Sequence, residues 1–171
     1  MLMAGIVYEL IDTLEEEREC YDGLCILAKY KEEAIVNKQI DFLQEVVKRE
    51  EEFAGRVSLL EKRRDALLND IAIVTGISTQ EINVTRLIGK LGVENDASKR
   101  LLELREQLLE KINSLKKQNE LNAMLIEHSL ELVNFTIKAI ESTRMQLPAT
   151  SYSKDGDNLG TTNHSFFDKK Q

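Results

Sequence analysis

The sequence predicts an all-α protein: an elongated antiparallel helical hairpin or three-helix bundle with a short capping helix and one very long C-terminal helix, followed by a disordered tail. The 171 residues include one proline and eight glycines, so little interrupts the backbone hydrogen bonds of long helices. Apolar residues recur three, four and seven positions apart, which places them on one face of a helix. Hydrophobic residues make up 42% of the chain and charged residues 31%, a composition typical of a chain that folds.

The first helix is expected over residues 3–36. Its apolar stripe thins across residues 15–19, which are all glutamate except for one arginine, and we expect this acidic run to be a solvated face. Asn37 marks the expected break before the second helix, with Asp41 as the alternative N-cap. Because nothing between Glu32 and Leu43 forbids a helix, the first two helices are also compatible with one continuous helix.

The second helix follows from an apolar stripe that runs from Leu43 to Val74. Gly76 comes soon after the stripe and is expected to supply the left-handed C-cap that lets the chain turn. The basic cluster at residues 62–64 (Lys-Arg-Arg) lies within this helix between two acidic residues. We expect this cluster to be a patch on the exposed face of the helix.

The connection that follows is rich in turn signals. Ser78 with Glu81 three residues later spells a capping box. Thr85 is expected to cap a short helix over residues 86–91, which Gly92 closes. We expect this short helix to form a cap over the end of the hairpin.

The last helix is expected to start at Asn95 or Asp96 and to continue without glycine or proline to about Met145. At 1.5 Å per residue it extends roughly 73 Å, so it needs other helices or a partner to stabilise it. A proline then ends the helical pattern. We therefore expect a helical domain over residues 1–146 and a flexible tail over residues 147–171, whose polar composition buries too little apolar surface to fold.

Two asparagines interrupt the apolar stripe of the last helix. Asn119 and Asn122 both fall where the spacing calls for an apolar residue. A buried asparagine in a helix seam costs stability but fixes register or pairing. The alternative is that the helix turns its polar face inward at this point, and the sequence leaves both interpretations open.

The segment from Leu125 to Ile140 carries more apolar residues than one packing face needs. They surround most of the helix circumference, so those that do not pack on the first two helices, including Leu132 and Phe135, should be exposed in a three-helix antiparallel bundle. Exposed apolar surface of this kind marks a partner site. The alternatives are burial against the first helix and the short cap, or burial in a homodimer. The candidate partner-binding residues are Leu125, Ile126, Leu132, Val133, Phe135, Ile137 and Ile140.

No pattern in the sequence points to catalysis, a cofactor or a metal. His128 and His164 are the only histidines, and neither has further ligands or a nucleophile at a recognisable spacing. The net charge of −7 argues against nucleic acid as a partner, and no apolar run is long enough for membrane insertion. Cys20 and Cys25 point apart on a helix and no secretory signal is seen, so we expect a reduced, cytoplasmic protein that is not an enzyme.

Several segments along the chain form a recognisable combination. They are the Leu43–Val74 helix with Arg63-Arg64 before Leu67-Leu68 and Gly76, the short helix Thr85–Leu91, Gln118–Asn122 followed by Leu125-Ile126 and Ser129-Leu130, Tyr152–Gly156, and Phe166-Phe167-Asp168. The most informative feature is Asn-x-x-Asn inside the last helix with Tyr-x-x-x-Gly just beyond it. Together these segments resemble the FlgN-type flagellar export chaperones, and the resemblance covers nearly the whole chain.

The resemblance implies a cytoplasmic chaperone of flagellar type III secretion. Such chaperones bind the C-terminal helical ends of hook-associated (hook–filament junction) proteins of the FlgK/FlgL type, prevent their premature assembly and deliver them to the flagellar export gate. The resemblance places the client-binding region on the segment from Leu125 to Ile140, where surplus apolar surface is expected. It also implies that Tyr152, just after the last helix, docks at the export gate.

Two other functions stay open: a homo-oligomeric coiled-coil scaffold, and a regulatory adaptor that binds another cytoplasmic protein. A scaffold should show strict heptads, whereas this stripe drifts between steps of three and four and is interrupted at Glu17 and Asn119. This drift favours a globular bundle that is a monomer or a weak homodimer. Apart from the resemblance, the sequence does not separate the adaptor from the export chaperone.

Overall fold

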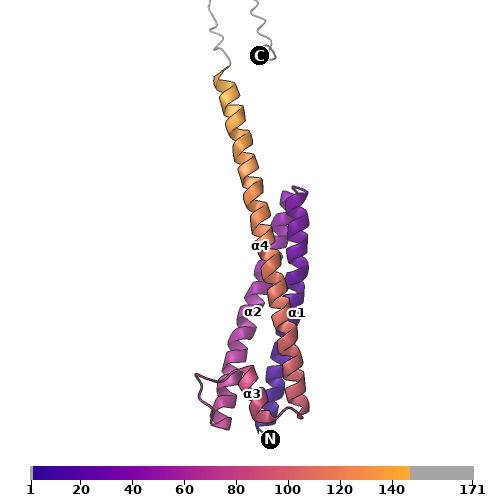
Figure 1. The fold of residues 1–171 in the computed structure, drawn as a ribbon, viewed down its shortest axis with the longest axis vertical. Coiled ribbons are helices and arrows are strands. Elements are labelled where there is room, and N and C mark those ends of the chain that lie inside the picture. The colour runs from indigo at the N-terminus through magenta and orange to yellow at the C-terminus, as the bar shows by residue number, and fades with distance from the viewer. Residues whose placement is uncertain (1, 147–171) are drawn as a thin grey trace, which may run out of the picture. The chain divides into compact units, whose positions relative to one another are not determined.

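The computed structural model describes residues 2–146, which form four α-helices and no strand (Figure 1). The helices are α1 (Leu2–Val36), α2 (Ile40–Thr75), α3 (Val84–Leu91) and α4 (Asp96–Met145). The predicted all-α architecture, with a short third helix and a very long last one, is confirmed. The predicted tail, residues 147–171, and Tyr152 with it, lie outside the described residues.

The chain divides into two compact units, Met1–Val133 and Asn134–Gln171, and α4 contributes to both. The first unit contains α1, α2, α3 and the larger part of α4. The second contains the last turns of α4. The predicted boundary between a helical domain and a tail after residue 146 stays a prediction.

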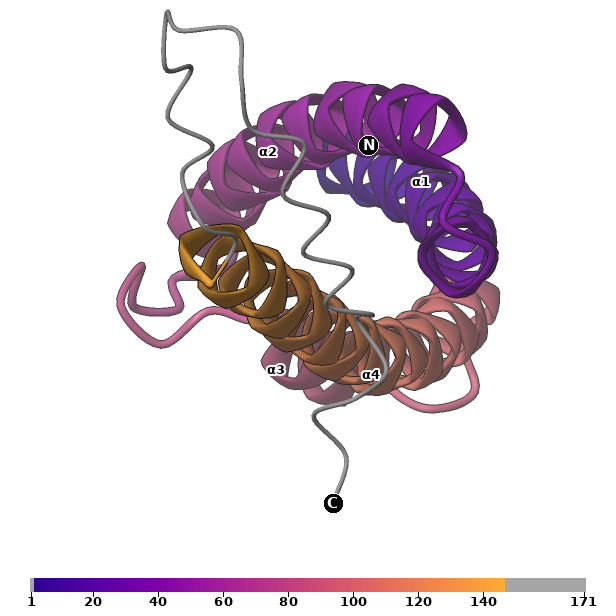
Figure 2. The same ribbon diagram turned by 90° about the horizontal axis from the view of Figure 1, so that it is seen from above.

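α1 and α2 form the antiparallel hairpin that the sequence predicts. Lys31, near the end of α1, pairs with Glu50, near the start of α2. Glu17, earlier in α1, pairs with Arg64, later in α2. Figure 2, which looks along the helices of the first unit, shows α1, α2 and the first part of α4 arranged around one another. α1 therefore lies between two helix neighbours over much of its length.

The ends of the hairpin helices follow local sequence signals. The break comes at Asn37, as predicted, and Lys38 adopts a left-handed φ of 57° that turns the chain. Gln39 is the N-cap of α2, without a side-chain hydrogen bond. The alternative cap at Asp41 is therefore wrong: Asp41 lies in the first turn of α2, where its charge favours the positive end of the helix dipole. Gly76, with a φ of 70°, closes α2 as predicted.

The connection to α3 uses different caps from those predicted. The capping box at Ser78 is wrong, because no helix begins there: residues 79–81 form a turn and the rest of residues 77–83 are irregular. The side chain of Asn83 instead caps α3 by accepting a hydrogen bond from the backbone N–H of Arg86 at 2.9 Å. Thr85 consequently lies inside α3 and does not cap it. The error arose because several short polar residues in this stretch were each suitable as an N-cap.

The main apolar core unites all four helices inside the first unit. Burying an aliphatic side chain of this size contributes about 1.5–3 kcal/mol, so this cluster is the main source of stability. Its buried members are Val7, Leu10, Ile11 and Leu14 from α1, Leu67, Leu68 and Ile71 from α2, Leu87 from α3, and Ala97, Leu101, Leu104 and Leu108 from α4. α3 thus acts as the predicted cap, with Leu87 fully buried against the long helices.

A second, smaller core lies further along the hairpin. Its buried members, Cys20, Leu24, Val57 and Leu60, all come from α1 and α2. From α4 only Leu115 packs against it, and Leu115 is only partly buried. α4 is therefore packed much less completely on the hairpin here than at its start.

The acidic run over residues 15–19 is not a uniformly solvated face, and this prediction was wrong for Glu17. Glu17 is only 1% exposed, and one of its carboxylate oxygens accepts a hydrogen bond from Arg64 at 2.8 Å. Glu15 pairs with Arg100 of α4. The physical reason is the position of α1 between α2 and α4, which leaves it little free circumference. Arg64, predicted to belong to a surface patch, is turned toward Glu17 instead.

Candidate partner-binding surface

One stripe of residues on α4 is buried at first and exposed later. Leu101, Leu104 and Leu108 are buried in the main core, and Asn122 is the last buried residue of the helix. Apolar residues continue the stripe beyond it at steps of four, seven, four and three, which keeps them on one face. They are Ile126, Val133, Ile137 and Ile140, and all four are exposed. We call these four residues the open stripe.

The two asparagines of the stripe, Asn119 and Asn122, differ in burial and in hydrogen bonding. The side-chain N–H of Asn122 donates to the backbone carbonyl of Ala28 in α1 at 2.7 Å, and its side-chain oxygen accepts from Gln118 at 3.3 Å. Asn122 is 2% exposed, whereas Asn119 is exposed. The buried asparagine therefore pairs α4 with α1 at one register, and only Asn119 turns toward solvent.

Four candidate residues lie in the first unit, just after Asn122. Ile126, Leu132 and Val133 are exposed, the last at 53%, while Leu125 is partly buried. The prediction that Leu132 would be exposed is confirmed. This end of the unit thus presents apolar side chains to solvent rather than to its own core.

The other three candidates lie in the second unit. Phe135 is 71% exposed, as predicted, and Ile137 and Ile140 are exposed as well. Burial against the first helix and the short cap, one of the alternatives, is therefore wrong for six of the seven candidates, Leu125 being the exception. Burial in a homodimer stays an open alternative.

The seven candidates divide into two sets around α4. The open stripe holds four of them. Leu125, Leu132 and Phe135 follow another line, because at about 100° per residue they fall well away from the stripe. The spacing of the seven residues already predicts these two sets. The sequence analysis did not separate them because apolar residues occur around most of the helix here.

A hollow between α1, α2 and α4 in the first unit was missed by the sequence analysis. It measures about 370 Å³ and is lined by Leu24 of α1, Ala54 of α2 and, on α4, Leu115, Ala123 and Ile126, among others. A second hollow of about 440 Å³ shares Leu115, Asn119 and Ala123 with the first. The first hollow exists only because three helices pack together, so no local pattern in the sequence reveals it.

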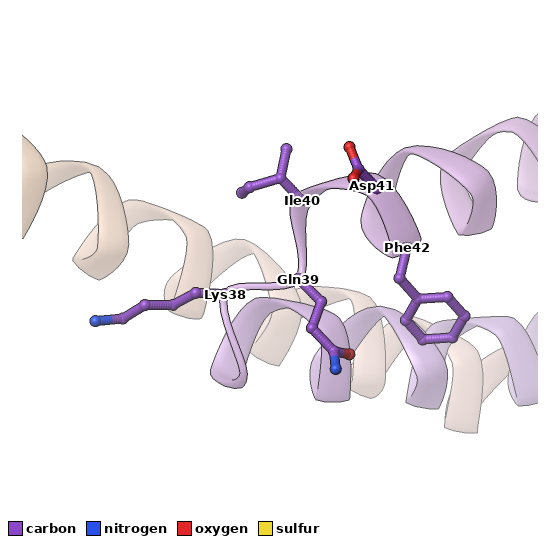
Figure 3. A pocket seen from close by; sticks show the side chains of 5 residues that line it. All are labelled: Lys38, Gln39, Ile40, Asp41 and Phe42. Carbon is purple, nitrogen blue, oxygen red and sulfur yellow. The ribbon is translucent and has the colours of Figure 1, made fainter.

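The turn between α1 and α2 forms a further hollow of about 720 Å³ (Figure 3). It is lined by five consecutive residues, 38–42, and in Figure 3 the side chains of Lys38 and Phe42 point apart. The ring of Phe42 lies edge-on against Tyr30, with 6.1 Å between the ring centroids. The side chains around this hollow do not converge on a common point, so it has no features of a small-molecule site.

Two cysteines on α1 and one histidine on α4 are the thiol and imidazole groups of residues 2–146. No group of three metal-binding side chains occurs among these residues. Burial raises the pKa of the thiols of Cys20 and Cys25, both free, which keeps them protonated and unreactive. His128 is exposed, with Nδ1 3.7 Å from the carboxylate of Glu131. Within the same residues, no helix is long and apolar enough to cross a membrane.

Comparison with known proteins identifies the family. The family model described as FlgN protein matches residues 1–160, a span that contains all four helices and the open stripe. Neither the curated proteins nor the solved structures give a match. The chain belongs to the FlgN family of flagellar export chaperones.

Proposed function

We propose that this chain binds the C-terminal helical ends of hook-associated (hook–filament junction) proteins through α4, prevents their premature assembly and delivers them to the flagellar export gate. The observation that carries the proposal is the open stripe, which has the spacing of a helix seam but is exposed. Membership of the FlgN family supports the class of client, because the family serves hook-associated proteins in general. Binding before export takes place in the cytoplasm.

The proposed mode of binding is a helix packed against a helix. A client terminus with apolar residues at steps of three and four lays that face on the open stripe, as amphipathic helices do in hydrophobic grooves. Each aliphatic side chain that becomes fully buried contributes about 1.5–3 kcal/mol. Ordering the client and losing its free motion offset much of this gain. The result is a reversible complex, which suits a chaperone that must release its client.

The test of the client site is the substitution Val133→Asp. Because Val133 is exposed, an aspartate should leave the fold intact while placing an unpaired charge in the proposed interface. Burying such a charge costs several kcal/mol, so we expect binding to weaken about 100-fold or more. The measurement is isothermal titration with a peptide of the C-terminal helical segment of a hook–filament junction protein, with circular dichroism to follow helix content.

The matched control is Leu59→Asp. Leu59 lies on α2, is 67% exposed and undergoes a similar chemical change away from the open stripe, so it should bind the peptide as the wild type does. Equal binding by both variants and the wild type would move the client site away from Val133. Unfolding of Val133→Asp alone would mean that Val133 belongs to the core.

The proposed role of Tyr152 rests on the family resemblance, and this residue lies outside the described part of the chain. If Tyr152 docks at the export gate, Tyr152→Ala should leave client affinity unchanged and impair secretion of the client in cells. Titration with the client peptide and a secretion assay measure the two effects separately. A loss of client affinity would assign Tyr152 to the client site instead.

A further inference from the structure

We propose that the client helix also occupies the groove between α2 and α4, and that it carries Lys or Arg along one edge of its apolar face. The groove consists of the two adjoining hollows of the first unit, and the residues that matter to it are Leu24, Ala54, Leu115, Asn119, Ala123 and Ile126. This inference rests on the proposed function. It adds where the helix lies in the first unit and what its edges carry.

The shape of the groove suits a helix. Leu24 of α1 lies in the smaller core between α1 and α2 and also lines the groove. Ala54 of α2 and Ala123 of α4 line it from the two flanking helices, and both are exposed. Small side chains on facing helices let another helix approach to the usual 8–10 Å between axes. α4 adds little to the smaller core here, so an incoming helix would complete a four-helix arrangement.

The polar groups of the groove favour a partner with an apolar face. Lys31 and Glu50, which also line the smaller hollow of about 370 Å³, are paired with each other. Asn122 is held by α1. Asn119 is exposed, and its side chain has no hydrogen bond among residues 2–146, so it can donate to or accept from one polar group of the partner. In the smaller hollow the charges of Lys31 and Glu50 therefore compensate each other, whereas the exposed Lys116 and Glu120 line the larger hollow.

The groove is continuous with the surface that the proposed function assigns to the client. Ile126 lines the smaller hollow and is also the first residue of the open stripe. Further upstream, Leu101, Leu104 and Leu108 of the same stripe are buried in the main core. Ile126 therefore belongs both to the groove and to the proposed client surface of the first unit, which identifies the occupant as the client helix.

The charged residues beside the groove indicate which charges the partner helix should carry. Glu120, Glu127 and Glu131 follow one another at steps of seven and four, so they form one acidic line along α4. All three are exposed, and Glu120 also lines the larger hollow. Glu127 directly follows Ile126, which places it about 100° around the helix from the open stripe. Lys116 lines the same larger hollow one turn before Glu120, but no lysine or arginine follows in residues 118–137. A partner with basic residues along the edge from Glu120 onward is therefore electrostatically complementary.

The first experiment fills the groove with larger side chains and leaves the charge of the protein unchanged. Ala54→Phe and Ala123→Phe each place a ring in the space that the client helix would take, and we expect each to weaken binding of the client peptide about tenfold or more. Ala66→Phe, at an exposed position of α2 outside the groove, is the control and should bind as the wild type does. Titration measures affinity, and circular dichroism checks that all three variants keep their helix content.

The second experiment tests the basic edge of the client helix. It removes negative charge beside the groove and keeps the size of the side chains. The double variant Glu120→Gln, Glu127→Gln should bind the peptide about threefold to tenfold more weakly at low ionic strength, with a smaller difference in high salt. The control double variant Glu106→Gln, Glu110→Gln removes two exposed glutamates from an earlier part of α4 and should bind as the wild type does. A client peptide whose lysines and arginines are replaced by glutamine should bind the two double variants equally.

The outcomes separate this inference from the function on which it rests. If the wild type does not bind the client peptide, the proposed function fails. If the wild type binds and both phenylalanine variants bind as tightly, the groove is not occupied and only the further inference is overturned. If the double variant Glu120→Gln, Glu127→Gln binds the peptide as tightly as the wild type at all salt concentrations, the inference of a basic edge on the client helix is overturned.

Discussion

Asn122 shows how one polar side chain sets the relation between two helices. Its hydrogen bond to the carbonyl of Ala28 is made at one register of α4 on α1 only. It comes at the point where the stripe of α4 changes from buried to exposed. A leucine at this position would extend the apolar seam but would specify the register less strictly.

Asn122→Ala should therefore destabilise the bundle. The variant loses the bond to Ala28 and the contact with Gln118, and we expect the free energy of unfolding to fall by about 1 kcal/mol. Asn119→Ala, three residues earlier at an exposed position, should change it by less than about 0.5 kcal/mol. Urea unfolding followed by circular dichroism measures both. Equal losses in the two variants would remove the structural distinction between the asparagines.

Glu17 gives a prediction about pH. Burial raises the pKa of its carboxyl, Glu61 and Asp65 raise it further, and Arg64 lowers it without cancelling the effect of burial. A carboxyl with a raised pKa in the folded state contributes its full stability below the unfolded pKa of about 4.3. That contribution is lost as the pH rises through the folded pKa.

The comparison is between the wild type and Glu17→Gln, which does not titrate. As the pH rises above about 4.3, the free energy of unfolding of the wild type should fall relative to that of the variant. Urea unfolding of both proteins from pH 4 to pH 8 gives this difference directly. A wild type that gains stability relative to the variant over this range would contradict the account.

Local and non-local features of single residues differ in how far the sequence predicts them. The breaks at Asn37 and Gly76 are local backbone features, with left-handed φ angles at Lys38 and Gly76, and both were predicted correctly. The burial of Glu17 depends on what packs around α1, so it could not be inferred from an acidic run. Asn83 was missed because its neighbours were equally suitable caps.

At the scale of elements, the three long helices were the easiest to predict. Their apolar stripes and the scarcity of proline extend over many turns, so small local errors do not change the assignment. The start of the short helix α3 was placed two residues too late, whereas its end at Leu91 and its closure by Gly92 were predicted correctly, because a helix of eight residues carries little periodic signal at its start. Which face of α4 stays open was predicted only in part, because exposure depends on where the hairpin ends.

The approach of α1 to α2 depends on a glycine. A Cβ at Gly23 would lie 2.7 Å from Cε1 of Phe53, whereas a Cβ at Gly55 of α2 would meet nothing within 4 Å. Gly55→Ala should stabilise the protein by about 0.5–1 kcal/mol through helix propensity alone. Gly23→Ala gains the same propensity but must displace the ring, so it should stabilise less or destabilise.

Thermal or urea unfolding of the two glycine variants measures this contrast. We expect the free energy of unfolding to be higher for Gly55→Ala than for Gly23→Ala. Equal stabilisation by both substitutions would mean that the Phe53 ring moves away at no cost and that the close contact does not hold the helices.

At the scale of the whole molecule, the fold class could be predicted from composition and periodicity, because both describe the chain as a whole. The candidate surface was predicted in part: the apolar excess after Asn122 was visible in the sequence, and most of its residues are exposed. The groove between α2 and α4 was not predicted. It depends on Ala54 and Ala123 lining one hollow from two helices that are far apart in the sequence.

The central claim is that the exposed surface of α4 binds a helical client end. The most direct test is isothermal titration of the full chain with the C-terminal helical segment of a hook–filament junction protein, together with sedimentation of the chain alone. The account predicts saturable one-to-one binding that is lost when residues 125–171 are removed, and a chain that is a monomer or a weak dimer. No binding at high micromolar concentration, with a stable dimer in sedimentation, would contradict it and favour a homo-oligomeric scaffold.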